Sequence, residues 1–252
     1  MNSKKMMYEQ LAADLCCTIV DLKNDKNIFI CDKKLEGART CKWDAISKLK
    51  LICINNKIVA RSEDSKVIDW LKENYTDFKG EWLSEYYSLR KLDEGLKQFG
   101  ICIGDFHPFF IPEEKKFEPN YNVLKSFELK WYNEQEILQF KGDQRFKEAL
   151  VFDEIAPDMI AITAEDNGQI IAMVAANTES KTIWQIGINV MPDYKGHGIG
   201  TAMVTLLKNK IMEMNILPYY GTAMSHTNSQ LVAIKSGFLP AWAELGTMSI
   251  DE

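Results

Sequence analysis

The chain has 252 residues, of which 46% are hydrophobic and 26% charged, and this composition is that of a folded, water-soluble protein with one large domain or two modest ones. The net charge of −6 and the lack of any lysine or arginine run argue against nucleic acid as a partner. No apolar stretch reaches the roughly 18 residues of a membrane span, and the polar segment 1–10 does not resemble a signal peptide, so we expect no membrane partner and a cytoplasmic location.

The cysteines are confined to the first part of the chain. Six are present, and they form no C-x-x-C pair and have no histidine cluster beside them. We interpret them as reduced structural thiols and predict no metal site, although a zinc site assembled from distant ligands is the alternative. Their positions are Cys16, Cys17, Cys31, Cys41, Cys53 and Cys102.

The first half of the chain predicts a small α/β domain of unknown role. Its β-rich runs predict strands at 27–31, 50–54 and 57–61, the last two joined by a turn at Asn55 and Asn56. Amphipathic patterns predict helices at 64–75 and 89–99, and Gly100 stands where a helix commonly ends.

Prolines and charges mark a domain boundary within residues 109–122. Pro108, Pro112 and Pro119 surround the charged run 113–116, and prolines of this kind interrupt regular structure. We therefore predict an N-terminal domain at 1–120 and a second domain at 121–252.

The second domain predicts the order β-α-α-β-β-β-α-β-α-β-β. Asn167 and Gly168 between two β-rich runs are a strong hairpin signal, because both turn residues must accept positive φ. Its fold class is predicted as α/β (α+β), with a mixed, mostly antiparallel sheet flanked by helices. The predicted strands are 126–132, 159–164, 169–177, 182–190, 217–223, 238–242 and 245–250, and the predicted helices are 134–150, broken near Gly142, 199–214 and 229–235.

The segment 191–200 indicates an anion site. Gly196, Gly198 and Gly200 precede and open a predicted helix, where backbone N–H groups lack intrahelical partners. The helix dipole favours negative charge at this end, and Lys195 adds a positive charge. A diphosphate-bearing cofactor is therefore indicated.

Two common nucleotide-binding motifs fit these glycines less well. A dinucleotide fingerprint needs its third glycine one place later and an acidic residue in the region 216–222, which has none. A phosphate-binding P-loop needs a lysine after its last glycine, but Thr201 follows Gly200. A tight turn without any ligand stays open as the structural alternative.

Two motifs in order resemble those of the GNAT acetyltransferase superfamily. The run from Val190 to Gly200 is similar to its acetyl-CoA motif, V-x-P-x-[FY]-[RQ]-G-x-G-[IVL]-[GA]. The run from Asn228 to Phe238 resembles its second motif, an asparagine or serine, a short helix and then Gly-Phe. The resemblance covers about residues 126–252 and implies a cytoplasmic N-acetyltransferase that uses acetyl-CoA.

The resemblance also implies where the cofactor binds. In this family the strand before the phosphate loop splays from the strand after the loop's helix, and the pantetheine arm lies in the gap. Backbone groups of the first strand would contact pantetheine and the acetyl carbonyl, the phosphate loop would hold the pyrophosphate, and the second motif would line the thiol end. The implied cofactor-binding residues are Ile188, Asn189, Val190, Lys195, Gly196, His197, Gly198, Ile199, Gly200, Thr201, Asn228 and Ser229.

The catalytic groups are harder to predict. A backbone N–H near Asn189 can polarise the thioester carbonyl, and His226 is a candidate base because an ordinary histidine titrates near neutral pH. Ala233 replaces the tyrosine that this family often uses to protonate the thiolate, so water, Ser229 or His226 would have to donate that proton.

Three questions stay open in the sequence. The acceptor could be a small-molecule amine or a protein N-terminus. The first 120 residues could cover the acceptor site, form a homodimer, or imitate half of a second domain without a phosphate loop. The alternatives to an enzyme are an inactive CoA-binding sensor or assembly module, and a purely structural α/β domain.

Overall fold

The computed structural model describes residues 2–41, 47–115 and 117–250, and its chain divides into two compact units. Unit 1 comprises Met1–Met6 and Phe110–Leu239, and unit 2 comprises Met7–Phe109 and Pro240–Glu252. Met1 and Glu252, the ends of the two predicted domains, and Lys116, the end of the charged run 113–116, lie outside the described residues.

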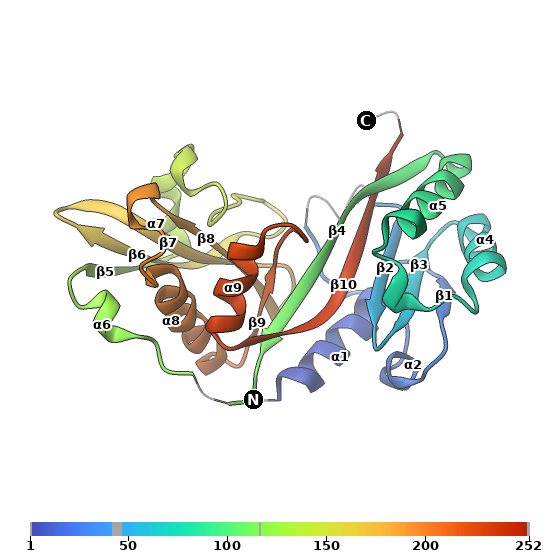
Figure 1. Ribbon diagram of the computed structural model, residues 1–252, viewed down its shortest axis with the longest axis horizontal. Coiled ribbons are helices and arrows are strands. Elements are labelled where there is room, and N and C mark those ends of the chain that lie inside the picture. The colour runs from blue at the N-terminus through green and yellow to red at the C-terminus, as the bar shows by residue number, and fades with distance from the viewer. Residues whose placement is uncertain (1, 42–46, 116, 251–252) are drawn as a thin grey trace. The chain divides into compact units, whose positions relative to one another are not determined.

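The described residues of unit 2 carry the strands β1-β3-β2-β10-β4, in this order across the sheet (Figure 1). Strand β2 runs antiparallel to β3 and β10, whereas β1 is parallel to β3. Its elements are α1 (Ser3–Leu15, from Met7 on), α2 (Ile19–Lys23), β1 (Ile28–Cys31), β2 (Leu49–Ile54), β3 (Lys57–Ser62), α4 (Ser65–Tyr75), η1 (Gly80–Trp82), α5 (Tyr86–Leu96), η2 (Lys97–Phe99), β4 (Ile101–Pro112, up to Phe109) and β10 (Phe238–Ser249, from Pro240).

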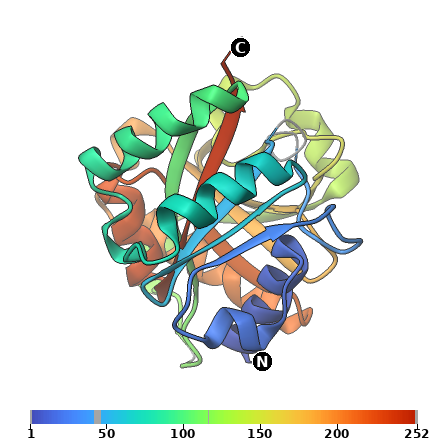
Figure 2. The same cartoon turned by 90° about the vertical axis from the view of Figure 1, so that its right-hand side faces the viewer.

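Helices α4 and α5 cover one face of these strands, and Figure 2 views the unit from that side. Val67 and Leu71 of α4 and Leu92 of α5 pack in one buried cluster with Ile58 and Ala60 of β3. Asp64 caps α4 by accepting a hydrogen bond from the N–H of Lys66 at 2.9 Å. The alternating apolar pattern of β3 therefore buries one of its faces against helices.

Unit 1 carries the strands β9-β8-β7-β6-β5, all antiparallel to their neighbours except β8 and β9, which are parallel. Asn167 and Gly168 form the turn between β6 and β7 with φ of 49° and 78°, as the sequence predicts for a hairpin. The elements of unit 1 are α6 (Tyr121–Leu124), β5 (Glu128–Asn133), α7 (Glu134–Ile137), η3 (Leu138–Phe140), η4 (Gln144–Phe146), β6 (Asp158–Asp166), β7 (Gln169–Thr178), β8 (Ile183–Val190), η5 (Pro192–Tyr194), α8 (Ile199–Glu213), β9 (Leu217–Gly221) and α9 (Thr227–Lys235).

Both faces of this sheet are covered (Figure 1). Helix α8 packs on one face, where Met203 and Leu207 join Val174 in the largest buried cluster. The segment 137–150 packs on the other face, where Phe146 meets Met173 and Ala175. Because β7 is buried on both faces, it reads as a nearly continuous apolar run.

The fold class is confirmed: the chain is mixed α/β, with mostly antiparallel strands flanked by helices. Two predicted details need correction. The segment predicted to be helical at 134–150 does break near Gly142, where φ is 91°, but its pieces are shorter than predicted: one α-helical turn and a 3₁₀ turn come before Gly142, and one 3₁₀ turn follows it. The strands predicted at 238–242 and 245–250 are one strand, β10.

Three further findings concern disulfides, metal sites and membrane-spanning helices. The six cysteines, all within the described residues, form no disulfide. Among the described residues, no group of three or more histidine, cysteine, aspartate or glutamate side chains is arranged to hold a metal ion. None of the helices in the described part of the chain is long and apolar enough to cross a membrane.

Candidate functional site

The predicted phosphate loop is an open turn that leads into α8. Gly196 and Gly198 have φ of 83° and 81°, a left-handed conformation that favours glycine. A Cβ built on Gly196 would meet nothing within 4 Å, and one on Gly198 only a methyl group of Val123 at 3.8 Å. Both glycines are therefore set by backbone conformation, and the space beside them is open.

The first turn of α8 supplies donors next to that space. Its first internal hydrogen bond runs from the N–H of Ala202 to the carbonyl of Gly198 at 3.0 Å, so the N–H groups of 199–201 come before any intrahelical acceptor. Lys195 and His197 are exposed in the loop, and Thr201 is half-buried. The loop thus combines helix-end N–H groups and a cation, the features that bind anions.

Close packing holds this helix end against β8. A Cβ on Gly200 would lie 2.9 Å from Cδ1 of Ile188 and 3.3 Å from Cγ2 of Val190. The third glycine of the motif therefore serves helix-on-strand contact rather than loop conformation. It brings 188–190 and 198–201 together, two of the predicted groups of cofactor residues.

Strands β8 and β9 separate as they approach the loop. Their parallel pairing joins Ile183 to Leu217, Trp184 to Pro218 and Gln185 to Tyr219, and it ends there. On its other side, β8 stays paired with β7 as far as Val190. In the described chain, the β9 side of residues 186–190 is therefore an open strand edge, with backbone groups available for a ligand.

The side chain of Asn189 faces away from this gap. Its Oδ1 accepts hydrogen bonds from the N–H groups of Glu148 at 3.0 Å and Ala149 at 2.8 Å. On the same face, a Cβ on Gly187 would collide with the carbonyl oxygen of Glu148. The Asn189 side chain thus fixes the 148–149 segment, and only its backbone is left for the predicted role at the acetyl carbonyl.

The remaining predicted residues lie at the start of α9. His226 is the N-cap residue, and the side chains of His226 and Asn228 are exposed. The half-buried Ser229 has its Oγ 2.9 Å from the hydroxyl oxygen of Tyr220 on β9. Among these candidates, Ser229 is the one tied to a buried titratable group.

Tyr220 is a further candidate site residue, because its contact with Ser229 cannot be predicted from the sequence. Its ring is buried at 2% exposure, and it packs against Phe238 with ring centroids 6.0 Å apart. Burial raises the pKa of Tyr220, and the hydrogen bond to Ser229 partly opposes that rise. From the sequence, Tyr220 is only an aromatic residue in a predicted strand. The one available signal is that this strand directly precedes the helix that carries Ser229.

Three further hydrogen bonds brace the candidate site, and the sequence does not predict them. The hydroxyl of Tyr194 donates to Asp166 at 2.8 Å, which ties the phosphate loop to the β6–β7 hairpin. The buried Lys208 of α8 donates to the carbonyl of Ser236 at 2.7 Å, and the hydroxyl of Ser236 donates to the carbonyl of Thr201 at 3.1 Å. The end of α9 is thereby joined to α8.

Four aromatic side chains of β8, β9 and β10 are packing residues. Trp184, Tyr219, Tyr220 and Trp242 are exposed by 6% or less. Tyr219 donates from its hydroxyl to Glu179 and lies 3.3 Å from the side-chain oxygen of Gln185. These buried side chains do not define an acceptor.

No curated protein matches this chain. A Streptococcus suis GCN5-related N-acetyltransferase-like protein shares 13% identity at a TM-score of 0.46, over 84% of this chain and 88% of that one. A Drosophila protein shares 15% identity at a TM-score of 0.47, over 77% of this chain and 70% of that one. The aminoglycoside N-acetyltransferase AAC(6')-Iy in complex with CoA shares 16% identity at a TM-score of 0.35, over 45% of this chain and 92% of that one.

The model of the acetyltransferase (GNAT) family matches residues 122–238. The match covers both motifs, the open edge of β8 and the first turns of α8 and α9. It supports acyl transfer as the general chemistry of unit 1. Residues 122–238 of this chain are a domain of the GNAT acetyltransferase family.

Proposed function

We propose that the protein is an N-acetyltransferase that moves an acetyl group from acetyl-CoA to a primary amine. The observation that carries the proposal is the arrangement of the β8 edge beside the N-terminus of α8. Gly196 and Gly198 leave open space in front of unpaired helix N–H groups, and the unpaired edge 186–190 leads away from it. An anion and a linear chain with amide groups fit these two features together.

In this proposal the residues of the phosphate loop hold the pyrophosphate. Backbone N–H groups from Gly196 to Thr201 donate hydrogen bonds to it, and the exposed side chain of Lys195 supplies a positive charge beside it. Backbone groups of Ile188, Asn189 and Val190 pair with the pantetheine arm and donate to the acetyl carbonyl, which stabilises the developing oxyanion. His197 and Asn228, both exposed, border the bound cofactor.

Acetyl-CoA would supply an activated thioester. The neutral amine attacks its carbonyl carbon, the new C–N bond forms as the C–S bond breaks, and the amine proton leaves to solvent or to His226. Ser229 donates a proton to the departing thiolate and takes one from the hydroxyl of Tyr220, which recovers its proton from solvent. In this assignment Ser229 and Tyr220 together do the work of the tyrosine that the family often has at the position of Ala233. Ala233 itself is fully buried.

The proposal is tested by binding and turnover in the intact protein. Acetyl-CoA at 100 times its dissociation constant should stabilise the native state by about 2.7 kcal/mol, measured as a rise in Tm. Thiol release should then depend on an added primary amine, with small amines and peptide N-termini tried in separate series. A protein without any Tm change at millimolar acetyl-CoA would not have this function.

A second function is a CoA-binding module without catalysis, and Ala233 favours it. Binding would then occur without amine-dependent thiol release in either series. The same two measurements separate the candidates, because an enzyme shows both signals, a sensor shows only the first and a structural domain shows neither.

A further inference from the structure

A small open cavity in unit 2 is lined mainly by cations. Its volume is about 10 Å³, and Asp14 is the one carboxylate in its lining. Arg39, Lys50 and Arg61 are exposed by only 2%, 7% and 9%. Lys34 and Ser47 complete the lining and are half-buried. Four positive side chains around a site of reduced water access create a potential that favours an anion.

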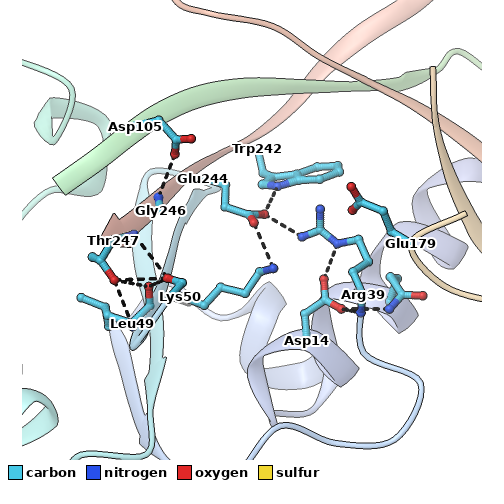
Figure 3. Close-up of polar contacts among 12 residues, drawn as sticks. Asp14, Arg39, Leu49, Lys50, Asp105, Glu179, Trp242, Glu244, Gly246 and Thr247 are labelled. Carbon is cyan, nitrogen blue, oxygen red and sulfur yellow. Dashed lines mark hydrogen bonds and ion pairs between the residues drawn. The ribbon is translucent and has the colours of Figure 1, made fainter. Parts of the chain in front are cut away.

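Nearby carboxylates interact with two of these cations (Figure 3). Asp14 accepts from Nε of Arg39 at 2.6 Å and from its backbone N–H at 2.7 Å. Glu244 accepts from Nη2 of Arg39 at 2.6 Å and lies 3.0 Å from Nζ of Lys50. Both carboxylates are therefore already used to stabilise Arg39 and Lys50.

Arg61 stands apart from this network. Its Nη1 donates to the carbonyl of Asp32 at 3.3 Å, a neutral acceptor. Its Nε is buried and has no hydrogen-bond partner among the described residues. A guanidinium cannot give up its proton, so a buried N–H without an acceptor is a standing cost. An anionic acceptor in the cavity would remove that cost.

We propose that this cavity binds a small anion, which Arg61 holds through Nε together with Lys34 and Ser47. A volume near 10 Å³ admits about one water-sized atom. The ligand is therefore a halide ion, or a carboxylate that inserts one oxygen and leaves the rest of its molecule at the open mouth. The site belongs to unit 2 and shares no residue with the proposed acetyl-CoA site, so it stands independently of that function.

The test titrates the intact protein with sodium chloride and, separately, sodium acetate, and the same titrations of Arg61→Gln separate binding at the cavity from a general effect of ionic strength. A saturable rise in Tm and a matching calorimetric isotherm are expected with at least one of the two anions, and which one distinguishes a halide site from a carboxylate site. Arg61→Gln should weaken that binding by about tenfold or more. Arg90→Gln, at an exposed arginine that pairs with Glu94, is the matched control and should bind as the wild type does.

If Arg61→Gln does not fold, Lys34→Gln replaces it, because Lys34 is only half-buried. Its matched control is Lys33→Gln at the exposed neighbouring position. Loss of affinity in Lys34→Gln alone supports the site. No saturable effect of either anion on the wild type, or equal affinity in Lys34→Gln and Lys33→Gln, would overturn it.

Discussion

The hydroxyl oxygens of Tyr220 and Ser229 lie 2.9 Å apart, and they link a buried side chain of β9 to the first turn of α9. If this pair protonates the thiolate, Tyr220→Phe should lower kcat by about tenfold to a hundredfold and leave the KM for acetyl-CoA nearly unchanged. The alkaline limb of the pH profile of kcat should also move. Tyr219→Phe is the control, because it removes a hydroxyl that is bonded to Glu179 instead. An unchanged kcat and pH profile in Tyr220→Phe would exclude Tyr220 from the proton path.

Gly198 should be required for cofactor binding and not for folding. Gly198→Val places a side chain into the open space before α8, at a φ of 81° that costs about 1–2 kcal/mol for any L-residue. Gly142→Val carries the same backbone penalty at a φ of 91°, also in open space, but away from the site. Both variants should lose similar stability on chemical denaturation, and only Gly198→Val should lose acetyl-CoA binding. Wild-type affinity in Gly198→Val would refute the placement of the pyrophosphate.

Asn189 should act on stability through its side chain. Asn189→Ala leaves the N–H groups of Glu148 and Ala149 without their acceptor, and we expect a loss of about 1–2 kcal/mol in the free energy of unfolding. Asn189→Asp keeps an acceptor at that position and should recover most of the loss. The exposed Asn228 provides the control, since Asn228→Ala should change stability by less than about 0.5 kcal/mol. Equal stability of the alanine and aspartate variants would contradict this role.

The backbone conformations at the candidate site are predictable from the sequence where local backbone chemistry determines them. Gly196 and Gly198 adopt left-handed φ because the loop requires it, and the Asn167–Gly168 hairpin follows the same rule. The contact between Tyr220 and Ser229 depends instead on how α9 packs on β9. The two residues lie on different elements, so no periodic pattern within one helix or strand predicts that they touch.

Some elements were missed although their sequence carries a signal. Met7, Leu11 and Leu15 are spaced by four and are all buried in α1, a helix that was not predicted from the sequence. Strand β4 is hard to predict for a physical reason: Pro108 and Pro112 lack an N–H and are rare inside strands, so they indicate a domain boundary instead. The strand nevertheless accepts both prolines within its 12 residues.

Packing overrides local propensity in the segment 134–150. Asn133 and Glu136 form a capping box that begins a helix, as their sequence suggests. The chain then bends, and Phe140 and Phe146 meet edge to face at 5.9 Å and enter one buried cluster. Burial of these two rings against the sheet is worth more than continued helical hydrogen bonds.

Lys208 should make stability rise with pH above about 8. Burial lowers the pKa of Lys208 from 10.5 to about 8, while the unfolded chain keeps the ordinary value. Between these two values the unfolded state binds more protons, so the wild type gains up to about 1.4 kcal/mol per pH unit relative to Lys208→Met. Denaturant unfolding at pH 7 and pH 10 measures this difference. Lys210→Met, at an exposed position of the same helix, should show no such change between the two pH values, and a constant difference for Lys208→Met would disprove the effect.

Glu244 should have the opposite pH dependence. Burial alone would raise its pKa, but the charges of Arg39 and Lys50 outweigh burial and lower the pKa from 4.5 to about 2. Its contribution to stability is therefore complete above pH 4.5 and is lost as the pH falls toward 2. Glu244→Gln should cost about 3–5 kcal/mol at pH 7, because Arg39 and Lys50 stay buried without their shared carboxylate.

That cost should shrink as the pH falls, since the wild-type carboxyl also becomes neutral. Urea unfolding of both proteins at pH 7, 4 and 2.5 follows the convergence. Glu94→Gln removes an exposed ion pair with Arg90 and should cost less than about 1 kcal/mol at pH 7. A difference between wild type and Glu244→Gln that is the same at pH 7 and pH 2.5 would mean that the charge of Glu244 does not hold Arg39 and Lys50 in place.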